Sequence, residues 1–78
     1  MILINIINYK IVLTKHTFVR ADEREIDLDK IYATIKGGTV KRLGKHTLQF
    51  TKQYKTYTIV CIGQIRADSI IILTVETK

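Results

Sequence analysis

The chain has 78 residues, enough for one small domain but not for a catalytic domain joined to a regulatory one. Hydrophobic residues make up 46% of it and charged residues 26%, proportions typical of a globular protein that exclude a disordered one. The net charge is +6: residues 1–39 carry six basic against five acidic side chains, and residues 40–78 carry seven against two. So basic a domain favours a polyanionic partner, nucleic acid first, although a basic surface that serves only solubility is the alternative.

The cysteine content and the N-terminal run limit the class of protein further. Cys61 is the only cysteine, which excludes an internal disulfide and a zinc site built on thiolates. It lies in the apolar run YTIVCIG, so we expect a buried hydrophobic residue and a cytoplasmic protein. Residues 1–13 are apolar but are interrupted by Asn5 and Asn8, and they lack a basic region and a cleavage site, so we expect no signal peptide. No run approaches the roughly 18 apolar residues of a membrane helix, so no membrane partner is expected.

The first half of the chain reads as a strand followed by two helices. Within a single domain over residues 1–78, residues 1–9 are expected to form an extra strand or an extension, and residues 10–14 form a strand. Thr14 is placed to cap a helix that runs from Lys15 to about Glu25.

The second helix has the clearer pattern. Asp27 is a good N-cap, Asp29 lies in the first turn, and Gly37 and Gly38 end the helix. Its apolar residues follow the helical spacing i, i+3, i+4 and i+7, at Leu28, Ile31, Tyr32 and Ile35.

After residue 38 the hydrophobic period changes from 3.6 to 2, which indicates strands. The segments TVKRL, HTLQFTKQY, TYTIVCIG and SIIILTVET are expected strands, with turns at Gly44-Lys45 and around residues 66–68. The last two segments are apolar on both faces, so we expect them at the centre of the sheet, with helices on one face and a second covering or a partner on the other. The predicted class is α+β, with two N-terminal helices packed on a mainly antiparallel sheet of four to five strands in the order β-α-α-β-β-β-β.

A stripe of cationic side chains marks the first helix. His16, Arg20 and Arg24 are four residues apart, so on a helix they lie along one side. Such a stripe would suit the binding of a phosphate group. The alternative is a solvated surface, because Glu23 and Asp27 each lie three residues after an arginine and would pair with it.

The residue types also fit RNA cleavage without a metal or other cofactor. That reaction needs a base, an acid and cations for the charged transition state, and the chain offers His16 and His46 with Arg20 and Arg24. His46 is included only because its imidazole could supply the acid or base of this reaction. Side chains of the second half that would track a phosphate backbone or stack on bases are Lys41, Arg42, Lys45, Lys52, Lys55, Tyr54 and Tyr57.

The segment KHTFVRADEREIDLDKI resembles the signature of a family of small bacterial and archaeal domains of unknown function, with the pattern H-A-x-x-R-x-x-x-R-G-I. Thr17 stands where alanine is usual and Glu25 where glycine is. Without glycine at position 25, the sequence also allows the two helices to continue as one helix with only a kink. The chain also ends in IIILTVE at 70–76, like the last strand of that family, and the likeness covers about residues 10–77. Matching positions are His16, Arg20, Arg24, Ile26, Ile31 and Gly37.

The resemblance implies a fold akin to the RelE-type and barnase-type ribonucleases of toxin systems. It implies a metal-independent endoribonuclease or a relative of one, with His16, Arg20 and Thr74 in the site and an antitoxin or other protein as a partner. Thr74 also has a simpler explanation, because threonine is a good strand residue.

Three functions therefore stay open at this point. The first is a toxin-like ribonuclease that uses the helix-borne His/Arg site. The second is a non-catalytic RNA-binding module, favoured if no second acid–base group reaches His16. The third is an interaction protein whose apolar sheet face builds a homodimer.

Overall fold

The computed structural model describes residues 9–78, so the extra strand or extension expected over residues 1–9 lies almost entirely outside the described residues. Two helices and five strands follow one another in the predicted order, which confirms the α+β class. Their bounds are β1 (Lys10–Leu13), α1 (Lys15–Glu23), α2 (Leu28–Gly37), β2 (Thr39–Arg42), β3 (Thr47–Gln53), β4 (Thr58–Arg66) and β5 (Ser69–Thr77).

The sheet has the strand order β1-β5-β4-β3-β2. Strands β2 to β5 form an antiparallel meander, while β1 pairs in parallel with β5, from Lys10 opposite Ser69 to Leu13 opposite Ile72. A parallel pair needs a crossover connection, and here α1, α2 and the meander together supply it. The two strands that are apolar on both faces, β4 and β5, each have a neighbour on both sides, as predicted.

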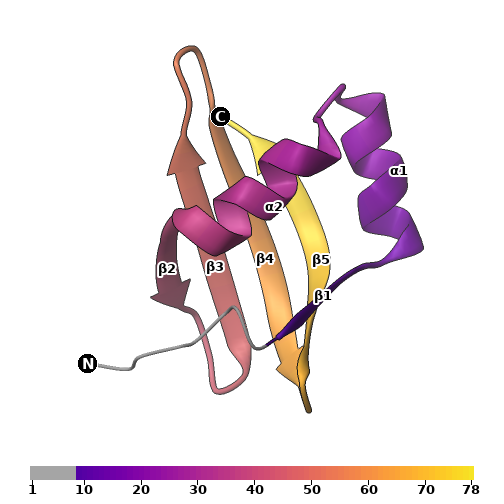
Figure 1. Cartoon of the computed structure of the whole chain (residues 1–78), viewed down its shortest axis with the longest axis vertical. Coiled ribbons are helices and arrows are strands. Elements are labelled where there is room, and N and C mark those ends of the chain that lie inside the picture. Colours follow the sequence, from indigo (N-terminus) through magenta and orange to yellow (C-terminus); the bar gives the residue numbers. More distant parts are fainter. Residues whose placement is uncertain (1–8) are drawn as a thin grey trace.

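Both helices lie on one side of the sheet. Figure 1 shows α2 crossing β3 and β4, and α1 running beside β5. In the part of the chain that the structure describes, no helix covers the opposite face, which we call the open face. The second covering that the apolar pattern predicted is therefore absent from residues 9–78.

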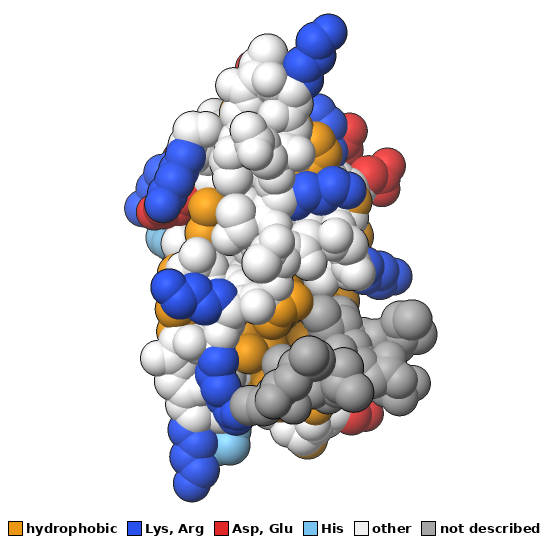
Figure 2. Space-filling view, turned by 90° about the vertical axis from the view of Figure 1, so that its left-hand side faces the viewer, with side chains coloured by type: hydrophobic (Ala, Val, Ile, Leu, Met, Phe, Trp, Pro, Cys, Tyr) orange, Lys and Arg blue, Asp and Glu red, His pale blue; other side chains and the backbone are white. Residues whose placement is uncertain are grey.

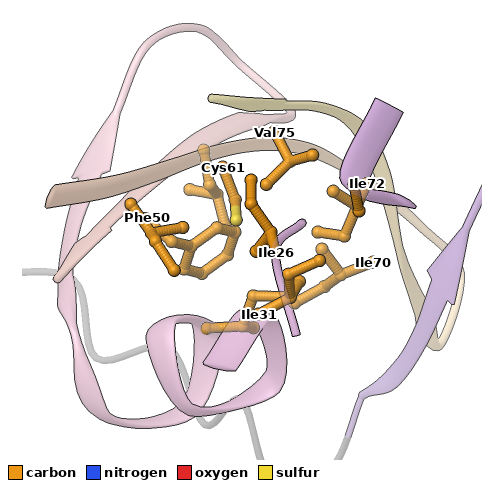
Figure 3. Close-up of a cluster of buried hydrophobic side chains, with 11 residues drawn as sticks. Ile26, Ile31, Phe50, Cys61, Ile70, Ile72 and Val75 are labelled. Atoms are coloured by element: carbon orange, nitrogen blue, oxygen red, sulfur yellow. The ribbon is translucent and has the colours of Figure 1, made fainter. Parts of the chain in front are cut away.

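The core fills the space between α2 and the sheet. Figure 3 shows Ile31 of α2 opposite Phe50 and Cys61 of the central strands, with Ile70 and Ile72 beside them. Each of these five side chains is fully buried. At about 1.5–3 kcal/mol for each large apolar side chain, this layer supplies most of the favourable free energy of a domain this small.

A Schellman motif separates the two helices. Glu25 has a φ of 56°, the left-handed region, and its N–H donates to the carbonyl of Asp22. The N–H of Ile26 donates to the carbonyl of Ala21 at 2.8 Å, and both side chains are buried in the core. Burial of Ile26 therefore imposes a turn that glycine would adopt more easily. The expectation that α1 continues to about Glu25 was wrong by two residues, and the helices do not run on as one.

Cys61 is a buried core residue, as its apolar surroundings predicted. Its thiol is fully buried opposite Phe50 on β3 and Val75 on β5. Desolvation raises its pKa to about 12, because the thiolate has no polar environment there.

Glu25→Gly is expected to stabilise the protein by about 1 kcal/mol, because glycine adopts a positive φ without the steric cost that a Cβ brings. Urea unfolding measures the change. Glu25→Gln is the matched control, since it removes the same charge and keeps the strained backbone. A gain that is as large in Glu25→Gln as in Glu25→Gly would assign the effect to charge and contradict the backbone explanation.

Cys61 is expected to resist thiol reagents in the folded protein from pH 7 to pH 10, because its pKa of about 12 keeps the thiolate population very small. In urea the same thiol should react rapidly, at a rate that rises with pH up to the ordinary thiol pKa. Timed labelling with a chromogenic disulfide reagent measures both rates. Equal rates in the folded and unfolded protein would show that the thiol is not buried.

Candidate nucleic-acid interface

Three hydrogen bonds fix the start of α1, and one of them reaches the sheet. Thr14 is the N-cap, as predicted, and its hydroxyl accepts from the N–H of Thr17 at 3.1 Å. The hydroxyl of Thr17 lies 2.8 Å from that of Thr14 and donates to the carbonyl of Ile72 at 2.7 Å. Ile72 is opposite Leu13, the last residue of β1, so this carbonyl lies where β1 leaves β5. Thr17, which departs from the alanine of the resembled family, thus connects α1 to β5 at a fully buried position.

His16 and Arg20 lie one turn apart on α1, and both are exposed. The buried side of the helix is formed by the adjacent positions Thr17 and Ala21. Arg24 is not part of the helix, because it is the C-cap residue with φ −94° and ψ 5°. The predicted stripe of three is therefore a helical pair followed by a cation at the helix end, where the N–H of Arg24 still donates to the carbonyl of Arg20 at 3.1 Å.

Arg24 lines a pocket of about 400 Å³ beyond the end of α1. Lys30 and Tyr57 line the same pocket, which is wide open to solvent. Five acidic residues lie between residues 22 and 29, and only one basic residue lies among them. Their field opposes the binding of an anion beside Arg24.

His46 is separated from α1 across the width of the sheet. It directly precedes β3, and its carbonyl accepts from the N–H of Ile65 at 2.8 Å. Strands β4 and β5 lie between β3 and α1, and neighbouring strands are about 4.8 Å apart. The structure does not bring the two histidines together, so it lends no support to His16 and His46 as an acid–base pair.

Thr74 lies on β5, the strand against which α1 packs. It is opposite Ile62 of β4 and follows a bulge in the pairing of these strands. Its neighbour Val75 is buried on the helix side, so the partly buried Thr74 faces the open side of the sheet.

The cationic side chains of the second half gather along one edge of the domain. Between residues 30 and 67 the chain has eight Lys and Arg residues and no Asp or Glu. Figure 2 shows this side of the molecule with Lys and Arg along its whole length and acidic side chains only at its margins. We call this surface the basic edge and define it by Lys36, Lys41, Arg42, Lys45, Lys52 and Lys55.

Some residues of the basic edge also hold local structure. The guanidinium of Arg42 donates to the carbonyls of Gly44 and Lys45 at 3.1 and 2.7 Å and so shapes the β2–β3 turn. The ammonium of Lys52 lies near Gly37, at the C-terminal end of α2, where the helix dipole favours a cation. Lys36, in the last turn of α2, was not predicted, because the predicted set contained only residues of the second half of the chain. The absence of acidic residues between positions 30 and 67 was the signal that would have included it.

Tyr54 and Tyr57 hold the β3–β4 hairpin against α2. Their rings stack on each other, with centroids 5.4 Å apart and planes at 18°. The hydroxyl of Tyr54 donates to the carbonyl of Lys30 at 3.0 Å, and the ammonium of Lys30 donates to the phenol oxygen of Tyr57. This last hydrogen bond raises the pKa of Lys30 above its ordinary value. One face of each ring is thus occupied. Both tyrosines therefore have a structural role, and base stacking by them stays a prediction.

Residues 9–78 were also compared with the requirements of a metal site and of a membrane-spanning helix. No group of three or more His, Cys, Asp and Glu side chains in this part of the chain is arranged to hold a metal ion. Neither helix of the described residues has the length and apolar character that crossing a membrane requires.

Comparison with family models, curated proteins and solved structures finds no match to the chain. The resemblance to the domain family with the His/Arg signature therefore stays an expectation from the residues that carry it.

Thr17→Val is expected to destabilise the protein by about 1–2 kcal/mol, because it leaves the Ile72 carbonyl without its strongest donor and removes the connection of α1 to β5. Thr34→Val is the matched control. Thr34 is also fully buried, but its hydroxyl donates to the carbonyl of Lys30 within the same helix. Thermal unfolding of both variants measures the difference. If Thr17→Val costs no more than Thr34→Val, the hydrogen bond to Ile72 is not what holds α1 in place.

Proposed function

We propose that this protein is a non-catalytic RNA-binding domain whose basic edge contacts the phosphate backbone. The carrying observation is the run of eight basic and no acidic residues between positions 30 and 67, six of which form the basic edge. Uncompensated cations on one surface release counterions when they meet a polyphosphate, and this release drives binding without reading the base sequence.

The shape of the basic edge favours a flexible strand over duplex DNA. The edge is formed by the short edge strand β2, by β3 with the turns that flank it, and by the last turn of α2. Within residues 9–78 no basic helix projects from it to enter a major groove. A single strand adapts to such a surface, and loops and single-stranded segments are the usual targets of RNA-binding domains.

A ribonuclease is the second candidate. The observation in its favour is the exposed pair His16 and Arg20 on a helix that hydrogen bonds hold in place. His16 would act as the general base and Arg20 would bind the scissile phosphate. The leaving oxygen needs an acid as well, and His46 lies beyond β4 and β5. Because the structure places no such acid near His16, we rank RNA cleavage below RNA binding.

The binding test measures the affinity of the full chain for a fluorescent single-stranded RNA, by anisotropy, between 50 and 200 mM salt. For Lys41→Glu/Lys45→Glu we expect the affinity to fall by about tenfold or more and the salt slope to fall by about 1 per lysine. Lys10→Glu/Lys15→Glu is the matched control, because it makes the same change in net charge at β1 and the start of α1, at the opposite edge of the sheet from β2. An equal loss in both variants would show that only net charge matters, and tighter binding to duplex DNA would contradict the preference for RNA.

A cleavage assay on the same RNA, in a chelator, separates the two candidates. We expect intact RNA at all times with the wild-type protein. Metal-independent cleavage that disappears in both His16→Ala and Arg20→Ala would overturn the non-catalytic proposal and establish the ribonuclease.

A further inference from the structure

A second pocket lies between the two helices, where α1 turns into α2. Its volume is about 200 Å³, and it is open to solvent. Ala21 and Ile26 give it a buried apolar floor, and the ring of Phe18 beside them is 51% exposed. We call it the α1–α2 pocket, and the residues that line it are Phe18, Ala21, Asp22, Ile26, Asp27 and Leu28. A cavity of roughly 150 Å³ holds a benzene-sized group, so this pocket is large enough for one apolar side chain.

Carboxylates border the α1–α2 pocket. Asp22 and Asp27 are the charged residues that line it, and both are exposed. Three more acidic residues lie close by in the sequence, at positions 23, 25 and 29, with one arginine among them. An apolar floor with a negative border is suited to an apolar side chain that has cations on either side of it. The pocket therefore favours a basic segment as its occupant and repels a nucleic acid.

The β2–β3 turn of this same chain has the complementary chemistry. Leu43 is 46% exposed, and Lys41 and Lys45 lie two residues before and after it. Residues 41–46 contain three Lys and Arg side chains and no acidic one. One exposed apolar side chain between two lysines thus matches one apolar pocket between two carboxylates, in size as well as in charge.

Hydrogen bonds hold the β2–β3 turn in one shape. The guanidinium of Arg42 donates to the carbonyls of Gly44 and Lys45 at 3.1 and 2.7 Å. The N–H of Leu43 donates to the carbonyl of Thr47 at 2.9 Å. Because the backbone that carries Leu43 is already ordered, docking does not have to order it, and this lowers the entropic cost of association.

We propose that the β2–β3 turn of one copy of this chain docks in the α1–α2 pocket of the next copy. Leu43 enters the pocket, between the ammonium groups of Lys41 and Lys45. These two cations lie beside the carboxylates of Asp22 and Asp27. A second copy is the occupant because each copy carries both halves of the contact, a negative pocket and a positive turn with an apolar side chain of the right size. The contact uses lysines that the proposed function assigns to RNA, so RNA competes with it, but the contact itself does not depend on RNA binding.

The two surfaces lie at opposite ends and on opposite sides of the molecule. Figure 1 shows the β2–β3 turn at the lower end of the sheet and the α1–α2 junction near the upper end. Leu43 faces away from the helices, because it is bonded to Thr47, the neighbour of the buried core residue Leu48. A two-fold dimer that makes the contact twice would need both surfaces on one side. Each contact therefore leaves a free turn and a free pocket, and further copies add head to tail.

The contact is small, so we expect it to be weak. One side chain and two exposed ion pairs bury far less than the roughly 1,000 Å² of a stable interface. We expect a dissociation constant on the order of 100 µM to 1 mM for each contact. Salt screens the exposed ion pairs, so an increase from about 50 to 500 mM should weaken the contact several-fold.

The test is sedimentation equilibrium of the full chain without RNA, from about 20 µM to 2 mM in about 50 mM salt. We expect the average mass to rise with concentration beyond that of a dimer, because the assembly has no closed end point. Leu43→Ser removes the apolar side chain and Asp22→Lys places a cation at the pocket, and each should raise the Kd by about tenfold or more. Glu76→Lys is the matched control. It makes the same change in charge as Asp22→Lys, beside the buried Val75 on the open face, and should leave the Kd unchanged.

Mixing the two defective variants separates this contact from any other. Leu43→Ser keeps an intact pocket and Asp22→Lys keeps an intact turn, so the mixture should form a complex that stops at one copy of each. Circular dichroism confirms that each exposed substitution leaves the fold intact. A wild-type monomer at the highest concentration overturns the proposal, and so does a mixture that stays monomeric. Single variants that assemble like the wild type, or a wild-type assembly that stops at two copies, also overturn it, because they assign the contact to another surface.

Discussion

The hydrogen bond from the buried hydroxyl of Thr17 to the carbonyl of Ile72 connects the first helix to the last strand. It forms at the point where β1 leaves β5, so one short contact fixes the parallel edge of the sheet, the start of α1 and the direction in which α1 runs. The two helices share the α1–α2 turn, and α2 closes the core over Phe50. All cations of the first helix and all of the basic edge are thus positioned relative to this contact and the core beside it.

The fold divides the surface of a small protein into regions of different chemistry. Acidic residues gather at the junction of the helices, between residues 22 and 29, while the basic residues that follow lie along β2, β3 and their turns. The open face lies between the edges and is nearly uncharged at its centre. Thr74 lies on the open face, opposite Ile62 of β4.

Much of this architecture followed from the sequence because the signals were local. Helix capping at Thr14 and the alternation of β3 act over a few residues, and both were confirmed. Asp27 occupies the N-cap position of α2, but its side chain makes no capping hydrogen bond. The end of α1 was not predictable, because Glu25 adopts a left-handed conformation only to bury Ile26. The distance of His46 from α1 depends on a strand order that no local pattern encodes. For the same reason the contact between the β3–β4 hairpin and α2, which occupies Tyr54 and Tyr57, could not be foreseen.

The central claim is that the basic edge, and not α1, is the surface that meets RNA. The most direct measurement is a titration of the ¹⁵N-labelled chain with a short single-stranded RNA, followed by amide chemical shifts. The account predicts that the shift changes concentrate on β2, the β2–β3 turn and the turn after β3, and that they weaken as salt rises. Changes centred on His16 and Arg20 instead, with the β2–β3 turn unaffected, would contradict it.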